Sequence, residues 1–326
     1  MSAPVASPDS QPVIVAQIVR SHFVEGHHYG SVVALDSDGD LDWSVGAATA
    51  PILPRSSNKP LQALGMVRAG LDLPADLLAL ACASHSGEPF HVEGVRRILA
   101  GAGLSESDLQ TPLGYPLDDD AREAVIRAGG HQSSILMNCS GKHAAMLATC
   151  VVNGWDTRSY LDPAHPVQQA ILATFTEFTE EPATVAVDGC GAPLLSTSLV
   201  GLARAFRRLA VATGGPERRV AEAIRRHPEF VSGTTRDERA LLTAIPGAIG
   251  KAGAESCYVV ALPDGRSFAL KTDDGAPRVR PVLMAEALRR SGVDREVGVD
   301  AVAVTRTGVL TLLGGGVPVG EIRACF

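Results

Sequence analysis

The sequence predicts an α/β fold of the α+β kind, with one mainly antiparallel sheet built from strands at both ends of the chain and a helical region inserted between them. Apolar runs bounded by turn residues mark strands in residues 13–48 and 255–326. Between them, residues 59–240 carry apolar side chains mostly at three- and four-residue spacing, as helices do. We therefore expect a flexible tail over residues 1–12 and a single domain over residues 13–326.

The individual elements follow from local patterns. The segment 30–46 predicts a hairpin turning at Asp36–Asp40, and its acidic turn is not a calcium loop because it lacks the bidentate glutamate that completes one. We expect helices over residues 118–128, 142–153, 165–178, 193–212, 217–226 and 277–291. We also expect a buried strand at 183–188, a hairpin at 256–275 that turns at Pro263–Gly265, and terminal strands over 301–326.

Composition narrows the class of protein. The 326 residues are 45% hydrophobic and carry a net charge of -7, which argues against nucleic acid or an anionic membrane as a partner. No apolar run approaches the roughly 20 residues of a membrane span, and the N-terminus lacks a secretory pattern. The six cysteines are scattered, as in a reducing compartment. We expect a cytoplasmic protein that acts on a small molecule.

Lysine is scarce in this chain. Only Lys59, Lys142, Lys251 and Lys271 are lysine among the 29 basic residues, so arginine supplies the general positive charge. A primary amine can lose its proton, whereas a guanidinium effectively cannot. Each lysine is therefore a candidate for a position that requires an amine.

The stretch "PRSSNKPLQ" places Ser56 three residues before Lys59, at the start of a predicted helix. One interpretation is structural: Ser56 or Ser57 caps the helix, and Pro60 occupies its first turn. That interpretation leaves Lys59 unexplained, because a cation in the first turn meets the positive end of the helix dipole. A neutral amine one turn from a serine hydroxyl can instead take its proton and activate a nucleophile.

Two further segments carry hydroxyl and amine groups. Ser84 lies in "ACASHSGEP", directly after an apolar run, and Lys271 ends a predicted strand in "FALKTDDG". A serine-x-x-lysine, a later serine loop and a lysine-threonine on a late strand occur in this order in penicillin-recognising serine hydrolases, which this arrangement resembles. The details differ, since Ser84-His85-Ser86 and Lys271-Thr272-Asp273 replace Ser-Asp-Asn and Lys-Thr-Gly.

A possible metal site lies in two other motifs. Cys139, Lys142 and His143 open a predicted helix in "MNCSGKHAAM", and Cys190 follows a strand in "VDGCGAP". Two thiols and a nitrogen suit a borderline-soft ion such as zinc, with water as a fourth ligand. Buried structural cysteines are the alternative.

Together, "RSSNKP", "SHSGEP", "NCSGKHA", "DGCGAP" and "ALKTDDG" resemble the L-asparaginase II family of the Rhizobium etli type. The resemblance covers most of the chain except the N-terminal tail. It implies a fold like that of serine β-lactamases, penicillin-binding proteins and glutaminases, and a homodimer. It also implies a catalytic domain that hydrolyses L-asparagine to L-aspartate and ammonia.

The resemblance also implies roles for individual residues. The pairs Ser56–Lys59 and Ser84–Lys271 would form two serine–lysine dyads, with Ser56 the nucleophile and Ser84 a relay. We prefer Lys271 to Lys251 in the second dyad because Lys271 lies in a strand context, whereas Lys251 lies in the glycine-rich stretch "GAIGKAGAE", which we expect to be a mobile loop. Zn²⁺ would be bound by Cys139, Lys142 and Cys190. Substrate would contact Arg55, Asp188 and His143, of which Asp188 would lie beside the metal.

The sequence leaves other functions open. A glutaminase or a β-lactam hydrolase could use the same dyads, because one additional methylene in a substrate is only weakly rejected by a pocket. A binding protein without catalytic activity, in which zinc is structural, is a different class of alternative. The sequence also leaves open whether Ser56 or Ser84 carries the acyl group.

Overall fold

The computed structural model describes residues 12–326, so the predicted tail lies outside the described residues except for Pro12. The chain divides into two compact units. The unit that we call the sheet unit contains the described residues up to Ser57, together with Thr197–Ala210 and Ala240–Phe326. The unit that we call the helical unit contains Asn58–Ser196 and Val211–Arg239. The helical unit thus takes in most of the predicted helical insertion, whereas residues 197–210 belong to the sheet unit.

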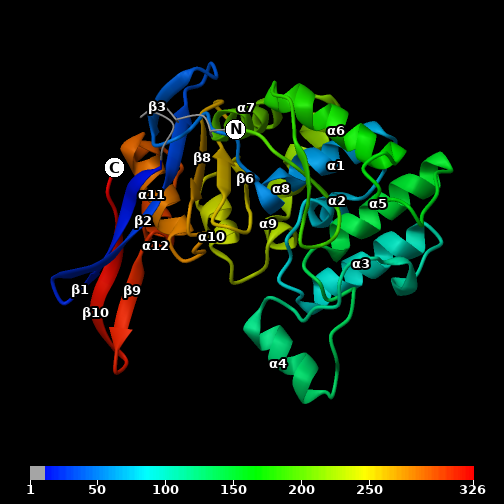
Figure 1. Cartoon of the computed structure of the whole chain (residues 1–326), viewed down its shortest axis with the longest axis horizontal. Coiled ribbons are helices and arrows are strands. Elements are labelled where there is room, and N and C mark those ends of the chain that lie inside the picture. The colour runs from blue at the N-terminus through cyan, green and yellow to red at the C-terminus, as the bar shows by residue number, and fades with distance from the viewer. Residues whose placement is uncertain (1–11) are drawn as a thin grey trace, which may run out of the picture. The chain divides into compact units, whose positions relative to one another are not determined.

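The sheet unit contains one antiparallel sheet in the order β6-β7-β8-β2-β1-β10-β9, with β3 paired to β2 (Figure 1). Its strands are β1 (Val13–Arg20), β2 (Phe23–Leu35), β3 (Leu41–Val45), β6 (Ile249–Ala252), β7 (Tyr258–Ala261), β8 (Ser267–Thr272), β9 (Leu310–Gly314) and β10 (Val317–Ala324). The N-terminal strands β2 and β1 are adjacent in the middle of this order, and strands from the C-terminal part of the chain flank them on both sides. The predicted α/β fold, with a sheet built from both termini, is confirmed.

The long strand β2 connects the two halves of the sheet. Its first half pairs with β1, from Phe23 to Gly30, and its second half pairs with β8, from Gly30 to Leu35. A side chain at Gly30 would meet the carbonyl oxygen of Lys271 at 2.5 Å, so glycine allows β8 to approach closely there. This register places Lys271 opposite Ser31.

Three helices belong entirely to the sheet unit: α7 (Leu199–Ala210), α11 (Arg280–Arg290) and α12 (Ala301–Thr307). Both α7 and α11 pack on β2 and β8. The short 3₁₀ helix η4 (Val293–Arg295) connects α11 to the segment before α12, and α10 (Asp237–Ala244) spans the boundary between the units. The core of this unit therefore lies between the central strands and the helices that cover them.

Several local predictions were wrong. Residues 301–307 form α12 instead of a strand, because the side chain of Asp300 accepts a hydrogen bond from Ala303 N at 3.0 Å and caps a helix. Residues 193–195 form a strand instead of the start of a helix. The strand at 185–187 exists, but Val185 and Val187 are exposed rather than buried.

The segment around Lys251, which looked mobile in sequence, is the buried strand β6. The glycines that suggested a loop serve close packing instead: a side chain at Gly250 would meet the carbonyl oxygen of Val259 at 2.9 Å. Lys251 is fully buried and donates a hydrogen bond to the carbonyl oxygen of Ala252 at 2.7 Å. A glycine-rich stretch in this chain can thus be a tightly packed strand.

The helical unit is built mainly from helices (Figure 1). They are α1 (Lys59–Arg68), α2 (Ala75–Ala81), α3 (Pro89–Gly101), α4 (Asp119–Arg127), α5 (Ser140–Asn153), α6 (Pro166–Thr179), α8 (Gly215–Arg226) and α9 (Pro228–Val231). The 3₁₀ helix η3 (Glu106–Asp108) and the two-stranded sheet of β4 (Val185–Val187) and β5 (Pro193–Leu195) complete the unit. In the described part of the chain, no helix combines the length and hydropathy needed to span a membrane.

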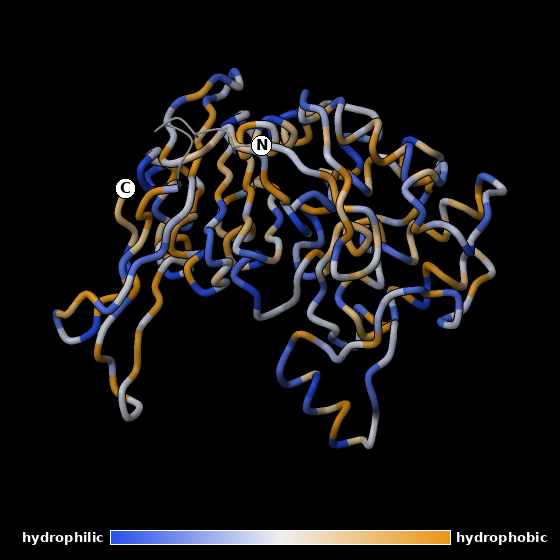
Figure 2. Tube along the Cα trace, viewed as in Figure 1, coloured by the Kyte–Doolittle hydropathy of each residue, from blue (hydrophilic) through white to orange (hydrophobic). Residues whose placement is uncertain are grey.

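Two of these helices form the core of the helical unit. In α1, every residue from Lys59 to Val67 is buried, and in α5 every residue from Ser140 to Cys150 is buried. By contrast, α4 has no buried residue, and Figure 2 shows hydrophilic residues along it with one hydrophobic stretch. A helix that is buried on all sides depends on its neighbours for stability. The contacts at the ends of α1 are therefore important.

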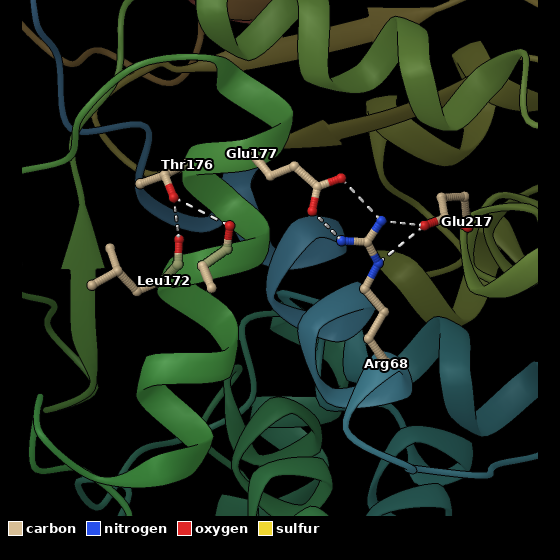
Figure 3. Close-up of polar contacts among 6 residues, drawn as sticks. Arg68, Leu172, Thr176, Glu177 and Glu217 are labelled. Atoms are coloured by element: carbon tan, nitrogen blue, oxygen red, sulfur yellow. Dashed lines mark hydrogen bonds and ion pairs between the residues drawn. The ribbon is translucent and has the colours of Figure 1, made fainter.

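The last residue of α1, Arg68, links three helices (Figure 3). Its guanidinium donates to Glu177 of α6 at 2.6 and 3.2 Å, and to Glu217 of α8 at 3.0 and 2.6 Å. It also lies 5.0 Å from the centre of the Phe178 ring. A planar guanidinium can satisfy two carboxylates at once, which an ammonium cannot do with the same geometry. Arg68 thereby fixes the C-terminal end of the helix that begins at Lys59.

We expect Arg68→Met to lower the free energy of unfolding by about 1–2 kcal/mol, because two carboxylates lose a common partner that is itself only 30% exposed. Urea titration would measure the loss. Arg96→Met is the matched control: Arg96 and Glu106 are 52% and 45% exposed, so we expect a loss below about 0.5 kcal/mol. Equal losses in the two variants would contradict the bridging role.

Candidate active site

Lys59 is the first residue of α1 and is only 1% exposed. The helix is preceded by the 3₁₀ turn η2 (Arg55–Asn58), and its N-cap residue, Asn58, makes no side-chain capping hydrogen bond. The hydroxyl of Ser57 instead donates to the carbonyl oxygen of Cys257 at 3.3 Å. The interpretation of Ser56 or Ser57 as the helix cap was therefore wrong, and the position of Lys59 still requires an explanation.

The amine of Lys59 has three partners, all in the helical unit. Nζ lies 2.6 Å from the carbonyl oxygen of Ala83, 2.9 Å from Oγ of Ser84 and 3.0 Å from Sγ of Cys139. A carbonyl oxygen only accepts hydrogen bonds, whereas a hydroxyl can also donate. A neutral amine in this position can give its two hydrogens to Ala83 and Cys139 and take the proton of Ser84. The geometry therefore suits proton transfer between Ser84 and Lys59.

The loop that carries Ser84 connects α2 to α3 and is anchored at almost every residue. His85 N donates to the carbonyl oxygen of Asn138 at 3.1 Å, and Ser86 N donates to that of Ser232 at 2.7 Å. Glu88 accepts hydrogen bonds from the backbone and hydroxyl of Thr234 at 2.8 and 2.6 Å. Ser84 itself is 8% exposed. Its hydroxyl is thus held in a rigid loop at the edge of the buried core.

The sheet unit positions the other predicted serine. Ser56 lies three residues before Lys59 along the chain and is 9% exposed. The preceding residue, Arg55, has a φ of 51°, a conformation that costs a non-glycine residue energy and is often found at functional sites. A side chain at Gly253 would meet Pro54 O at 2.6 Å, so β6 approaches this segment closely. Within the sheet unit, Ser56 is therefore fixed by a strained backbone.

The sheet unit also contains two other predicted site residues, Arg55 and Lys271. Arg55 lies 3.5 Å from Glu255, measured between Nη1 and Oε1. The amine of Lys271, at the end of β8, donates to the carbonyl oxygens of Glu255 at 2.8 Å and Thr272 at 3.3 Å. The structure thus brings Arg55 and Lys271 to the same residue, Glu255. The predicted pairing of Ser84 with Lys271 stays a prediction.

The helical unit brings together four of the predicted metal-site and substrate residues. The possible ligand atoms of Cys139, Asp188 and Cys190 all lie within 4.8 Å of one another. Lys142 Nζ donates to Sγ of Cys190 at 3.2 Å, and Cys190 Sγ lies 3.6 Å from Oδ2 of Asp188. Only Asp188 is partly exposed, whereas Cys139, Lys142 and Cys190 are at least 97% buried. Asp188 therefore lies where the cluster meets solvent.

The charges in this cluster are unequal. A hydrogen bond with Cys190 and the positive charges of Lys59 and Lys142 outweigh burial and hold the pKa of the Cys139 thiol well below its usual range. The same hydrogen bond and burial raise the pKa of Cys190. Burial lowers the pKa of Lys142, but the charges of Cys190, Cys139 and Asp188 overcome this effect and raise it. Without a metal, the cluster thus holds the thiolate of Cys139 beside the ammonium group of Lys142.

His143 lies in the same helix as Lys142 and is fully buried. Its Nδ1 lies 2.8 Å from the hydroxyl of Tyr160, which also accepts a hydrogen bond from Gln110 N at 3.2 Å. Burial lowers the pKa of His143 to about 4, so the imidazole is neutral near pH 7. His143 is therefore held by the protein interior rather than presented at an exposed surface.

Sequence reasoning missed two parts of this site. The segment Ser232–Thr234 supports the loop of Ser84, and Gly233 has no room for a side chain because Ser86 Oγ would lie 2.1 Å away. The other is the buried His85, which follows Ser84 and whose ring bonds to Ser140 at the start of α5; the ring of His91 stacks behind it, with centroids 5.2 Å apart. The run of small residues in "VSGTTRD" was the one signal in the sequence for the first part. No pattern in the sequence indicated that His85 and His91 would stack.

Comparisons with known proteins place the chain in context. A family model described as L-asparaginase II matches residues 16–324. No curated protein is significantly similar in sequence to the chain. Three solved structures similar to this chain are a β-lactamase from Mycobacterium bovis, the hydrolase EstCE1, which has promiscuous acyltransferase activity, and a glutaminase from Bacillus subtilis in a covalent complex with 5-oxo-L-norleucine.

These three structures are distant from the chain in sequence. The β-lactamase has 14% identity and a TM-score of 0.37, with 80% of this chain and 94% of the other covered. EstCE1 has 12% identity and a TM-score of 0.43, with 84% of this chain and 93% of the other covered. The glutaminase has 11% identity and a TM-score of 0.39, with 81% of this chain and 88% of the other covered.

The buried histidines predict a stability that depends on pH. Burial lowers the pKa of His91 from 6.5 to about 4, so below pH 6.5 the unfolded chain binds a proton that the folded chain does not. The free energy of unfolding should therefore fall as the pH falls from 6.5 to about 4, by up to about 1.4 kcal/mol per pH unit for this one histidine. Urea titrations at a series of pH values measure the slope.

His91→Gln should remove that part of the slope. The control is Phe230→Leu, which changes a neighbouring ring without removing a titrating group and should destabilise the protein by a similar amount at every pH. An unchanged slope in His91→Gln would show that His91 is not the neutral buried base that the structure indicates.

Proposed function

Because the chain belongs to the L-asparaginase II family, whose model spans nearly its whole length, we propose that the protein hydrolyses the side-chain amide of L-asparagine to L-aspartate and ammonia. The observation that supports the proposal best is the buried amine of Lys59, which lies 2.9 Å from the hydroxyl of Ser84. A serine hydroxyl becomes a nucleophile or a proton relay when an adjacent base can take its proton.

The proposed reaction passes through an acyl-enzyme. Ser56, three residues before Lys59, is our proposed acyl carrier, and its hydroxyl gives its proton to the neutral amine as the oxygen attacks the side-chain amide carbon. Backbone N–H groups stabilise the oxyanion. The proton then passes from Lys59 through Ser84 to the leaving nitrogen, and ammonia departs. Water next cleaves the aspartyl ester, and the serine regains its proton.

We propose that Arg55, Asp188 and His143 help to bind the substrate, as the family resemblance implied. The guanidinium of Arg55 has the planar fork that matches a carboxylate, and its contact with Glu255 is long at 3.5 Å. Asp188 is the part of the cysteine cluster that solvent reaches, and a carboxylate there can accept hydrogen bonds from the α-ammonium of an amino acid. His143 would act indirectly, because it is fully buried.

We also propose that Cys139, Lys142 and Cys190 hold Zn²⁺, with Asp188 beside it. The donor set fits: zinc favours thiolate, nitrogen and carboxylate ligands about 2.0–2.3 Å from the metal, and such ligands lie roughly 3–4 Å apart. The possible ligand atoms of Cys139, Asp188 and Cys190 lie within 4.8 Å of one another, and Lys142 Nζ lies 3.2 Å from Cys190 Sγ. Lys142 and Cys190 would release protons when the metal binds. A zinc ion there would polarise an oxygen of the substrate or of water.

The homodimer and the cytoplasmic location remain proposals that the family resemblance and the composition support. Within the sheet unit, β9 is the terminal strand of the sheet, and it carries the exposed side chain of Leu313. Val309, which precedes β9, and Val317, the first residue of β10, are also exposed. Exposed apolar side chains on an edge strand suit an interface between copies of a protein.

Serine substitutions test the proposed reaction. We expect Ser56→Ala, Ser84→Ala and Lys59→Met each to lower kcat/KM for asparagine by about 10³-fold or more, because each removes a member of the proton path. Ammonia release from asparagine and from glutamine measures the activity. Ser86→Ala is the matched control in the same loop, and we expect it to stay within about threefold of the wild-type value.

A covalent label identifies the acyl carrier. A diazoketone analogue of asparagine should modify Ser56, and mass spectrometry of the peptides locates the adduct. An adduct on Ser84 would show that the roles of the two serines are exchanged. Release of ammonia from glutamine or turnover of a chromogenic β-lactam, with no ammonia from asparagine, would contradict the proposed substrate.

Metal analysis tests the zinc site. The purified protein should contain about one zinc per chain, and Cys139→Ser should lose it because a thiolate ligand is missing. The matched control is Cys150→Ser, since Cys150 lies in α5, the helix that Cys139 precedes, is also buried and is outside the cluster. Zinc retained in Cys139→Ser, or absent from the wild-type protein, would remove the metal from the proposal.

A further inference from the structure

His85 follows Ser84 directly and is fully buried in the helical unit. Burial holds its pKa well below the usual range, so its imidazole is neutral near pH 7. Its Nδ1 is buried and has no hydrogen-bond partner within the described residues. Leaving a buried nitrogen unpaired costs about 1–3 kcal/mol. An apolar residue at position 85 would avoid that cost. The contact of the other ring nitrogen, Nε2, must therefore explain why a histidine is present.

The hydrogen bonds of Ser140 fix the tautomer of His85. Ser140 Oγ lies 2.7 Å from the carbonyl oxygen of Ile135, which can only accept, so the hydroxyl hydrogen points there. Nε2 of His85 lies 2.9 Å from the same Oγ. Since Ser140 has no second hydrogen, Nε2 must be the donor. His85 therefore carries its hydrogen on Nε2, and Nδ1 is the bare nitrogen.

His85 thus connects the loop of Ser84 to the start of α5 at two points. Its backbone N–H donates to Asn138 O at 3.1 Å, and its ring donates to Ser140 on the other side of Cys139. Ser84 and Cys139 are the two side chains that share the amine of Lys59. The distance between Ser84 and Cys139 therefore depends on the residue that joins their backbones.

We propose that His85 is a positioning residue, whose Nε2–H···Oγ bond to Ser140 holds Ser84 and Cys139 at the separation that lets Lys59 contact both. This inference rests on the proposed function, because it assigns Ser84 and Lys59 to the proton path. His85 does not touch the substrate in this scheme. A displacement of about 1 Å in a reacting group can lower turnover by about 100-fold, so loss of this bond should affect kcat more than KM.

Two substitutions at His85 separate positioning from packing. His85→Leu fills the space with an apolar side chain and removes the donor. We expect kcat to fall by about 100-fold and KM to stay within about threefold of the wild-type value. His85→Gln keeps an N–H donor at nearly the position of Nε2, and we expect it to restore at least about tenfold of that loss. Equal effects of the two substitutions on kcat would overturn the proposal.

Removing the acceptor should have the same effect as removing the donor. We expect Ser140→Ala to lower kcat about as much as His85→Leu, and the double variant to be no worse than either single variant. If His85→Leu does not fold, Ser140→Ala tests the same hydrogen bond. His91→Gln is the matched control, because His91 is equally buried but bonds to Glu229 O instead of to α5. His91→Gln should lower stability and leave kcat unchanged. Additive losses of kcat in the double variant of His85→Leu and Ser140→Ala would contradict the proposal.

Nitrogen NMR of the histidine-labelled protein tests the arrangement without using activity. We expect His85 to be the Nε2–H tautomer, with a slowly exchanging N–H that exchanges faster in Ser140→Ala. An Nδ1–H tautomer, or exchange that is unchanged in that variant, would overturn the inference. If the wild-type protein releases no ammonia from asparagine, the proposed function fails, and the NMR result still decides the role of His85.

Discussion

The burial of one amine imposes most of the constraints on the helical unit. Lys59 is 1% exposed, and a buried amine must find partners for every hydrogen that it keeps. The chain supplies them from two segments far apart in sequence, the loop at Ala83–Ser84 and the start of α5 at Cys139. Helix α1 is buried along almost its whole length, so its position depends on Lys59 at one end and Arg68 at the other.

Close backbone contacts hold these segments together. A side chain at Gly141 would meet Leu80 O at 2.6 Å, so α5 can start against the end of α2 only because that residue is glycine. Gly233 has the same role for the segment that supports Ser86 and Glu88. Neither glycine carries a functional group. They allow three elements to meet within hydrogen-bond distance of one another, and the polar side chains that the elements carry are then rigid because their backbones are.

The sequence predicted the parts that depend on local patterns and could not predict those that depend on packing. The sheet from both termini, the helical insertion and most helices follow from apolar periodicity. The side chains of residues 301–307 alternate as in a strand, but the capping hydrogen bond to the side chain of Asp300 stabilises a helix there instead. Short spacing within motifs identified Ser56, Lys59, Cys139 and Lys142. The contact of Lys59 with Ser84 joins α1 to the loop after α2, so no local spacing indicated it. The partners of Lys142 and Asp188 became visible only when Cys190 was placed in space.

The scarcity of lysine has a practical consequence. Lys59, Lys142 and Lys251 are each at most 1% exposed, and only Lys271 has part of its surface open to solvent. Reagents that couple to amines on a folded protein therefore reach one side chain, at the end of β8, instead of modifying the surface at random. Attachment to a support through lysine would give a single orientation, with the end of β8 facing the support. The rest of the surface could then be modified with reagents that react with carboxylates or arginines.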